Sequence, residues 1–193
     1  MRHTSNRFST KTIVYCALFA ALAVVLGRIT AVQIPPDAKY CLDKFIMFMS
    51  GMFFGPVLGA MVGFVADCVG SLSLGYGFTW YLSLPAILYG LFGGLFQNFL
   101  KKEFSLIRLG IAYLFPIVIG SIVWQSFAFS YMKGINTFSQ IAIVYLIPRT
   151  IQFAIMLVLE VALIYTLIKT NLFCRVGLWP RQNRKKEVDK NDC

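Results

Sequence analysis

The chain has 193 residues, of which 58% are hydrophobic, and its formal net charge is +10. Ordinary globular domains are roughly 45–50% apolar, so this composition predicts one compact membrane domain without a separate catalytic domain. The Lys and Arg residues gather in the termini and short connections instead of lining one face among aromatic residues, which argues against a nucleic-acid-binding protein.

Motifs for catalysis and for metal binding are absent from the sequence. It contains no P-loop, no GxSxG and no HExxH pattern. The five cysteines show no CxxC spacing, and the single histidine, His3, stands in a polar tail. We therefore predict no enzymatic activity, no metal site, no cofactor and no disulfide framework.

The first predicted membrane helix covers residues 12–32 and follows a basic tail, residues 1–11. It is long enough to cross a bilayer at about 20 residues per span. It lacks an A-x-A-type cleavage site, which favours a retained span over a signal peptide. Ala17 and Ala21 form a small-xxx-small pair that suits close helix contact, although alanine is also common in membrane helices. Arg28, near the far end, fits either a side chain that reaches the lipid headgroups or an anion-binding group in a cavity.

Residues 33–43 form a predicted polar loop, because Pro35-Pro36 is incompatible with helix and Asp43 is expected to be solvated. The apolar stretch 49–67 follows, with glycines at every fourth position. These glycines are Gly51, Gly55, Gly59 and Gly63. Residues four apart share a helix face, and glycines on that face let another backbone approach closely. Pro56 interrupts the stretch, so we predict that two helices meet near Gly55-Pro56.

Five further spans are predicted after the first one. They cover residues 44–55, 56–73, 78–99, 109–131 and 138–168. The first of these five is short and is expected to be tilted or partly re-entrant. The basic residues concentrate in the two tails and in the connection with Lys101, Lys102 and Arg108, so the positive-inside rule places both termini in the cytoplasm. The predicted units are a cytoplasmic tail (1–11), a membrane domain (12–170) and a basic cytoplasmic tail (171–193).

Several spans carry polar or aromatic residues at a similar depth in the outer half of the membrane. These residues are Arg28, Asp67, Trp80, Tyr81, Gln125 and Arg149. Charged groups inside a membrane usually mark a functional site. The layer suits an outward-facing pocket for a planar, partly anionic molecule, in which Asp67 accepts from ring N–H groups and an arginine pairs with a carboxylate. The alternative is that Asp67 and Arg149 form a buried ion pair that stabilises the fold.

Glu160 stands eleven residues after Arg149. At 100° per residue it returns to nearly the same helix face, but about 16 Å deeper. We therefore expect Glu160 to lie outside the pocket and to make a structural or partner contact towards the cytoplasmic side.

Three sequence features together resemble the substrate-binding S component of an energy-coupling factor (ECF) vitamin transporter. They are the Ala-x-x-x-Ala first helix ending in VLGR, the block GMFFGPVLGAMVGFVAD at residues 51–67, and FTWYLS at residues 78–83. The chain is most similar to the folate-type subgroup, whose members carry a comparable G-M-x-F-G-P-x-x-G-A-x-x-G-x-x-A-D block. The likeness covers about residues 12–170.

The resemblance implies an all-α bundle of six transmembrane helices with one outward-facing vitamin pocket, in the bacterial cell membrane with both termini cytoplasmic. It implies partners, namely a transmembrane scaffold subunit and two ATPase subunits, with ATP hydrolysis confined to the latter. Ala17 and Ala21 match the alanine motif that meets the scaffold subunit. Loops around residues 33–40 and 71–78 would act as lids.

The segment before the fourth helix departs from the folate-type pattern, because it lacks the expected proline and places Trp80-Tyr81 there. Folate is therefore the first candidate ligand, and another vitamin or vitamin precursor is the alternative. Two other classes stay open: a stand-alone secondary transporter, and a membrane scaffold with a filled outer half. The candidate ligand-binding residues are Arg28, Gln33, Lys39, Asp67, Phe78, Trp80, Tyr81, Trp124, Gln125 and Arg149.

Overall fold

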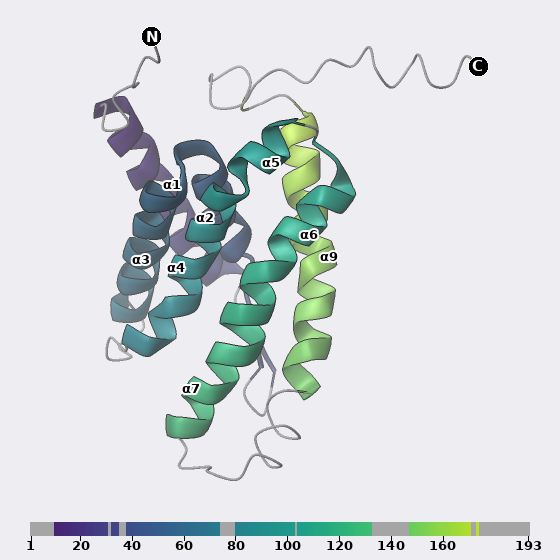
Figure 1. The fold of residues 1–193 in the computed structure, drawn as a ribbon. Coiled ribbons are helices and arrows are strands. Elements are labelled where there is room, and N and C mark those ends of the chain that lie inside the picture. Colours follow the sequence, from purple (N-terminus) through teal and green to yellow (C-terminus); the bar gives the residue numbers. More distant parts are fainter. Residues whose placement is uncertain are drawn as a thin grey trace, which may run out of the picture.

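The computed structural model describes residues 10–30, 32–34, 38–73, 80–102, 104–132, 147–170 and 173. Within them the elements are α1 (Thr10–Ile29), β1 (Val32–Ile34), β2 (Ala38–Tyr40), α2 (Lys44–Phe54), α3 (Pro56–Ser73), α4 (Trp80–Leu95), α5 (Gln97–Lys102), α6 (Leu106–Pro116), η1 (Ile117–Trp124), α7 (Gln125–Met132) and α9 (Ile147–Lys169). The helices form one bundle, with α1 to α4 on one side and α6, α7 and α9 on the other (Figure 1).

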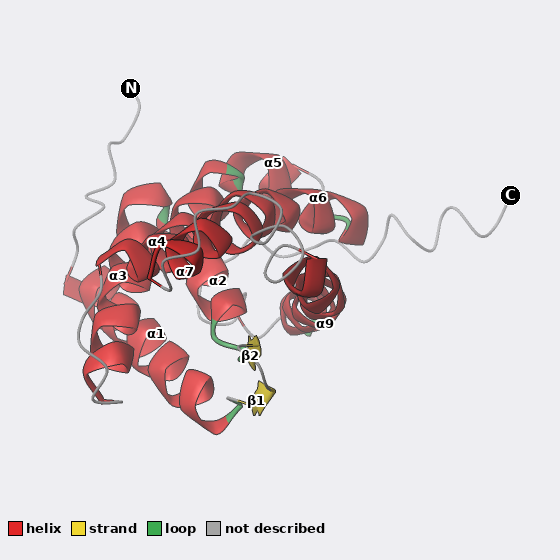
Figure 2. Cartoon of the chain, turned by 90° about the horizontal axis from the view of Figure 1, so that it is seen from below, coloured by secondary structure: helices red, strands yellow, loops and turns green. Residues whose placement is uncertain are grey.

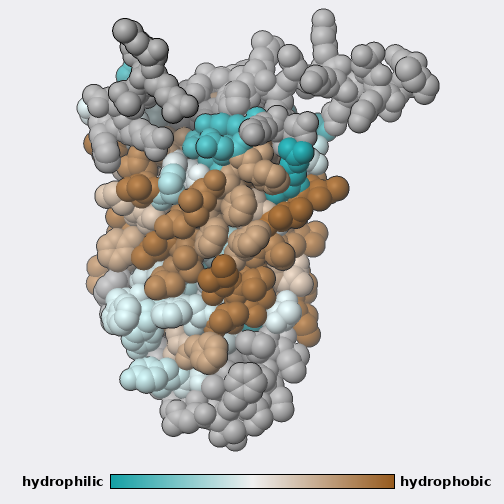
Figure 3. Space-filling model, in the orientation of Figure 1, coloured by the Kyte–Doolittle hydropathy of each residue, from teal (hydrophilic) through white to brown (hydrophobic). Residues whose placement is uncertain are grey.

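The helical bundle predicted from the sequence is confirmed. Four helical stretches among the described residues are long and apolar enough to cross a bilayer. These are Thr10–Ile29, Pro56–Ser73, Leu106–Ala128 and Arg149–Lys169. The two remaining predicted spans correspond to the shorter apolar helices Lys44–Phe54 and Trp80–Leu95. In Figure 3 hydrophobic side chains cover the middle of the visible face, the most hydrophilic ones lie at the end where α5 lies, and weakly hydrophilic ones lie towards the opposite end.

The predicted junction between two helices at Gly55-Pro56 is confirmed. Helix α2 ends at Phe54, and α3 begins at Pro56. Gly55 between them has φ 96°, a conformation that residues with a Cβ rarely adopt. Proline suits the first position of the new helix, because its missing N–H would have no intrahelical partner there.

The glycine face of α2 and α3 packs directly against the backbone of α4. A Cβ on Gly51 would lie 2.0 Å from the Gly90 carbonyl oxygen, and one on Gly63 would lie 2.2 Å from the Ala86 carbonyl oxygen. A Cβ on Gly59 would meet the Gly51 Cα at 2.4 Å. The glycines are therefore required by close backbone approach, as their spacing predicted.

Helix α2 is the centre of the bundle. Every residue from Phe45 to Phe53 is buried, and the view along the bundle shows α2 enclosed by α1, α4 and α9 (Figure 2). A helix that is apolar on all sides is expected in such a position. Helix α2, which is shorter than the candidate membrane spans, is thus a buried helix at the centre of the bundle.

Three boundaries differ from the sequence prediction. The predicted loop 33–43 contains an antiparallel hairpin, in which Gln33 is the partner of Lys39. The last long helix starts at Ile147, and residues 138–146 lie outside the described part. The predicted span 109–131 contains a π-helical segment, η1, between α6 and α7. Pro116 stands at its start, and the Gln125 N–H donates to the Gly120 carbonyl at its end.

Candidate ligand-binding site

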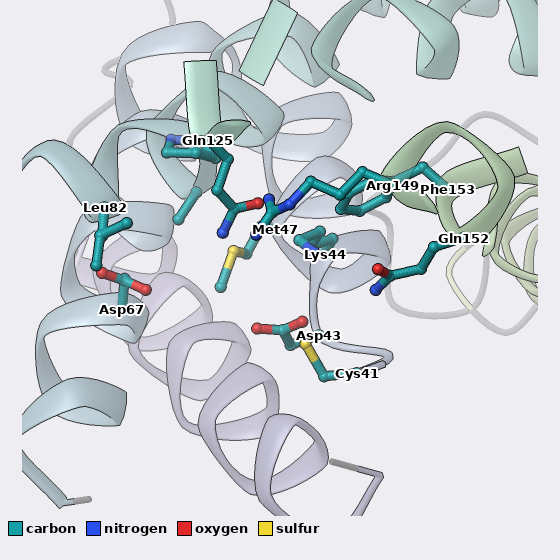
Figure 4. A pocket seen from close by; sticks show the side chains of 12 residues that line it. Cys41, Asp43, Lys44, Met47, Asp67, Leu82, Gln125, Arg149, Gln152 and Phe153 are labelled. Atoms are coloured by element: carbon teal, nitrogen blue, oxygen red, sulfur yellow. The ribbon is translucent and has the colours of Figure 1, made fainter. Parts of the chain in front are cut away.

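A cavity of about 170 Å³ lies between α2, α3, α4, α7 and α9 (Figure 4). Its lining combines charged, amide, thiol and apolar side chains. The lining residues are Cys41, Asp43, Lys44, Met47, Asp67, Leu82, Pro85, Ala86, Gln125, Arg149, Gln152 and Phe153. Five helices and the segment before α2 contribute to it, so the cavity exists only in the folded bundle.

The carboxylate of Asp67 is held by the neighbouring helix α4. Ser83 is buried and donates its hydroxyl hydrogen to Asp67 Oδ2 at 2.5 Å. The close approach of α3 to α4, which the glycines permit, brings these two side chains together. One oxygen of Asp67 is thereby oriented, and its side chain lies beside Leu82 at the edge of the cavity (Figure 4).

The opposite wall comes from one face of α9. Arg149, Gln152 and Phe153 stand three and four residues apart, which places them on the same side of a helix. Arg149 is 8% exposed and Gln152 is 5% exposed, although both are polar. In Figure 4 the Arg149 side chain extends from α9 across the cavity towards Gln125.

Gln125 reaches the cavity from the first residue of α7, directly after the π-helical segment. A π-helical turn contains an extra residue, so it rotates all following side chains relative to an uninterrupted α-helix. Such segments are frequent at functional sites. Gln125 follows the segment and lines the cavity, whereas Ser121, within the segment, is buried and hydrogen-bonded to Tyr89 at 3.0 Å.

The start of α2 supplies two opposite charges to the cavity. The Lys44 ammonium lies 4.8 Å from the centre of the Phe153 ring and 6.0 Å from that of Tyr89. Asp43 precedes it at the N-cap position, but its side chain does not cap the helix. Asp43 Oδ1 is buried and has no hydrogen-bond partner among the described residues. Asp43 is half-buried and packs beside Gly27 of α1, so the expectation of a solvated carboxylate was wrong.

Three of the residues selected from the sequence meet in this cavity, namely Asp67, Gln125 and Arg149. Arg28 instead donates from Nη2 to the Gly70 carbonyl at 2.8 Å, which ties α1 to the end of α3. Arg28 is not among the residues that line this cavity.

The selected aromatic residues that the structure describes, Trp80, Tyr81 and Trp124, lie outside the cavity lining. Trp80 is 68% exposed, and its ring meets that of Tyr81 edge-on at 5.7 Å. Trp124 donates its indole N–H to the Tyr81 carbonyl at 2.7 Å, which joins η1 to the start of α4. Phe78 and the side chains of Gln33 and Lys39 lie outside the described part of the chain.

Sequence reasoning missed several lining residues, above all Lys44, Asp43 and Gln152. Asp43 ends the predicted polar loop and Lys44 directly follows it, so neither residue stands out in the sequence as a cavity residue. The only available signal was that the helix after them is apolar on all sides and therefore buried along its length. Gln152 could have been found from its position three residues after Arg149.

A second buried polar group lies deeper and outside the cavity lining. Glu160 is 1% exposed, and its Oε2 accepts a hydrogen bond from the Tyr113 hydroxyl at 2.6 Å. This bond connects α9 to α6, which confirms the expected structural contact. Glu160 Oε1 has no hydrogen-bond partner in the part of the chain that is described.

Comparison with known proteins identifies similar membrane transport proteins. Residues 7–169 match the sequence model of the family described as ECF-type riboflavin transporter, S component. A solved structure, FolT bound with folic acid, is 28% identical, with a TM-score of 0.68 over 82% of this chain and 91% of that chain.

Two curated relatives, both from Streptococcus pneumoniae, bear the name UPF0397 protein. One, from serotype 19F, is 27% identical over 121 residues, which are 61% of this chain and 66% of the relative. The other, from strain CGSP14, is 30% identical over 95 residues, which are 49% of this chain and 52% of the relative. The chain thus spans less than two thirds of the length of either relative.

The family match extends over most of the chain, and a folate-type S component shares its fold. These two findings agree with the apolar helices and with the resemblance derived from residues 12–170. The chain therefore belongs to the family of S components of ECF-type transporters, which are membrane transport proteins and not an enzyme family.

Proposed function

We propose that the protein is the substrate-binding subunit of an ECF importer, which captures a vitamin from outside and delivers it with a shared ATP-driven module. The observation that carries the proposal is the mixed polar cavity inside an apolar bundle, with Asp67 on one wall and Arg149 on the other. Buried charges are costly in a membrane protein and are retained where they serve a substrate. Family membership supports the same function.

Folate is the first candidate ligand. A pterin ring presents N–H groups that Asp67 can accept, and the glutamate tail presents carboxylates that Arg149 can bind in a bidentate manner. The structural neighbour with folic acid bound supports this choice. Riboflavin, which the family description names, carries no carboxylate for Arg149 to bind.

A compact vitamin precursor is the second candidate, because of the cavity size. Its volume of about 170 Å³ is below the roughly 300 Å³ at which pockets for drug-sized ligands begin. A heterocycle with a short anionic substituent would fill such a space. Whole folate would need to extend beyond the described lining, towards the hairpin end of the bundle.

Ligand titration of the purified protein tests this function. Binding would be measured by titration calorimetry with folate, riboflavin, thiamine, biotin, pantothenate and pterin-6-carboxylate. We expect saturable binding of one folate-type ligand, and we expect Asp67→Asn to weaken it by about tenfold or more through loss of a charged acceptor. Normal binding by Asp67→Asn would exclude the ring-recognition role. No binding of any of these compounds would contradict the proposed function.

The coupling module is tested through the exposed small residues of α1. Ala17 and Ala21 are exposed, as a docking face requires. We propose that they contact the scaffold subunit, so Ala21→Trp should prevent co-purification of the module while ligand binding persists. Leu22→Trp is the matched control, because Leu22 is exposed and lies about 100° from Ala21 and about 140° from Ala17 around the same helix. Uptake into liposomes without the ATPase subunits, driven by an ion gradient, would instead favour a secondary transporter.

The orientation in the membrane forms part of the proposal. The start of α1, the end of α9 and the basic helix α5 lie at the same end of the bundle, opposite the hairpin (Figure 1). By the positive-inside rule this end faces the cytoplasm. The hairpin end, next to the cavity lining at Cys41 and Asp43, then faces outward.

A further inference from the structure

The ammonium group of Lys44 occupies an unusual environment in the cavity. Lys44 is the first residue of α2, and its Nζ faces the rings of Phe153 at 4.8 Å and Tyr89 at 6.0 Å. Neither a hydrogen bond nor an ion pair joins it to any other described residue. The group therefore has two aromatic neighbours and three N–H donors that remain available.

The ammonium lies within electrostatic range of Asp43 and Glu160, but no hydrogen bond to a described residue satisfies its N–H donors. Attraction to aromatic rings offsets only part of the cost of removing an ammonium group from water. Asp43 is adjacent in sequence, yet its buried Oδ1 is itself without a hydrogen-bond partner among the described residues. Glu160 is also buried, but its only described hydrogen bond comes from Tyr113. An anionic group in the cavity would complete the environment of Lys44.

The position of Lys44 fits contact with a ligand. It lines the same cavity as Arg149, which is 8% exposed and comes from α9. Lys44 comes from α2, the enclosed central helix, so its backbone is fixed from all sides. Two cations from different helices on one cavity can hold the two oxygens, or the two carboxylates, of an anionic substituent.

We propose that Lys44 determines specificity for an anionic ligand, by binding a carboxylate of the substrate against the aromatic surfaces of Phe153 and Tyr89. The inference rests on the proposed function, since it assigns the charge of the ligand at the same site. It goes beyond that function by naming the residue that distinguishes a carboxylate-bearing vitamin or precursor from its neutral counterpart.

A structural role for Lys44 makes a different prediction. If the ammonium served only as a distant counter-charge for Glu160, its removal would alter stability and would affect all ligands equally. A ligand-binding role predicts instead that discrimination between charged and neutral ligands is lost. The comparison of two ligands in one variant therefore separates the two roles.

The test uses two ligand pairs with the full-length protein in detergent. The first pair is folic acid and its bis-amide, and the second is pterin-6-carboxylate and 6-hydroxymethylpterin. We expect the wild type to prefer the carboxylate of at least one pair. In Lys44→Met, affinity for the carboxylate should fall by about 10- to 100-fold, as for loss of a charged hydrogen bond, with little change for the neutral ligand.

Two further variants keep the result interpretable. Lys169→Met removes a lysine that lies 5.5 Å from the Tyr165 ring on the exposed end of α9, and it should leave both affinities unchanged. Lys44→Arg keeps the positive charge and should retain the preference for the carboxylate, which allows the test even if Lys44→Met does not fold.

Each outcome bears on the inference. An unchanged preference in Lys44→Met, or loss of the preference in a folded Lys44→Arg, would overturn it. Binding of only neutral ligands by the wild type, riboflavin included, would also overturn it while leaving the transport function intact. Absence of binding by the wild type to any probe would count against the proposed function itself.

Discussion

The two halves of the bundle are held together by different means. Helices α2, α3 and α4 meet through glycines, where a Cβ on Gly90 would lie 2.0 Å from the Gly59 carbonyl oxygen. Helices α6 and α9 meet through side chains, with the Tyr113 hydroxyl bound to Glu160 at 2.6 Å. The first contact depends on the absence of side chains, and the second depends on particular ones.

The cavity lies at the seam between these halves. The glycine half contributes Asp67, fixed by Ser83, and the other half contributes Gln125 and Arg149. Close backbone packing provides a rigid wall, because glycine contacts leave few side chains to rearrange. The second half carries the π-helical segment, and both halves place polar side chains on the cavity. The cavity thus lies between a wall fixed by close backbone packing and a wall of side chains from α7 and α9.

The largest expected effect comes from substitution in the glycine half. Gly90→Ala places its Cβ against the backbone of α3, which cannot move as a flexible side chain would. We expect a loss of more than about 3 kcal/mol, beyond ordinary overpacking, and little folded protein in detergent. Gly110→Ala is the control, because nothing lies within 4 Å of a Cβ there. Thermal unfolding of both variants gives the comparison, and equal stability would contradict the backbone contact.

A single substitution in the half that contains α6 and α9 should lower the free energy of unfolding less. Tyr113→Phe removes the hydroxyl that donates to Glu160, and leaves the buried carboxylate with one partner fewer. We expect destabilisation by about 1–3 kcal/mol, the cost of an unsatisfied buried polar group. Tyr131→Phe, at a side chain that is 80% exposed, should have no measurable effect in the same unfolding assay. A similar small effect for both would show that the Tyr113 bond contributes little.

Changes at the seam should affect binding more than stability. Ser83→Ala removes the donor that orients Asp67 and should weaken ligand binding by about fivefold, near 1 kcal/mol. Ser73→Ala, at an exposed serine of α3, provides the matched control. Titration calorimetry measures the affinity of both variants for the ligand that the binding assay of the proposed function identifies. Unchanged affinity in Ser83→Ala would mean that Asp67 is oriented by other contacts.

The smallest effect is expected outside the cavity lining. Trp80 is 68% exposed, so Trp80→Phe should change stability by less than about 0.5 kcal/mol, as for most surface positions. Its effect on affinity should remain below that of Ser83→Ala. A larger loss of affinity would show that Trp80 stacks on the bound ligand, as its sequence position suggested.

Much of the fold could be predicted because the relevant signals are local. Apolar length, the glycine period and Pro56 identified the helices and the junction at Gly55. Asp67, Gln125 and Arg149 were selected because polar residues are rare in membrane spans and their depth follows from the rise of a helix. The two short strands and the π-helical segment had no comparably strong local pattern.

The sequence by itself determined that the chain is a helical membrane protein and that one helix face is reserved for close backbone contact. Tertiary structure decided which polar residues meet. In the sequence, Asp43 and Lys44 stand at the boundary between a polar loop and a helix. In the structure they line the cavity, because α2 is enclosed by other helices. Trp80 was expected at the depth of the pocket, but its side chain is exposed and lies outside the cavity lining. Depth along a helix is a property of sequence, whereas the direction of a side chain within the bundle depends on how neighbouring helices pack around it.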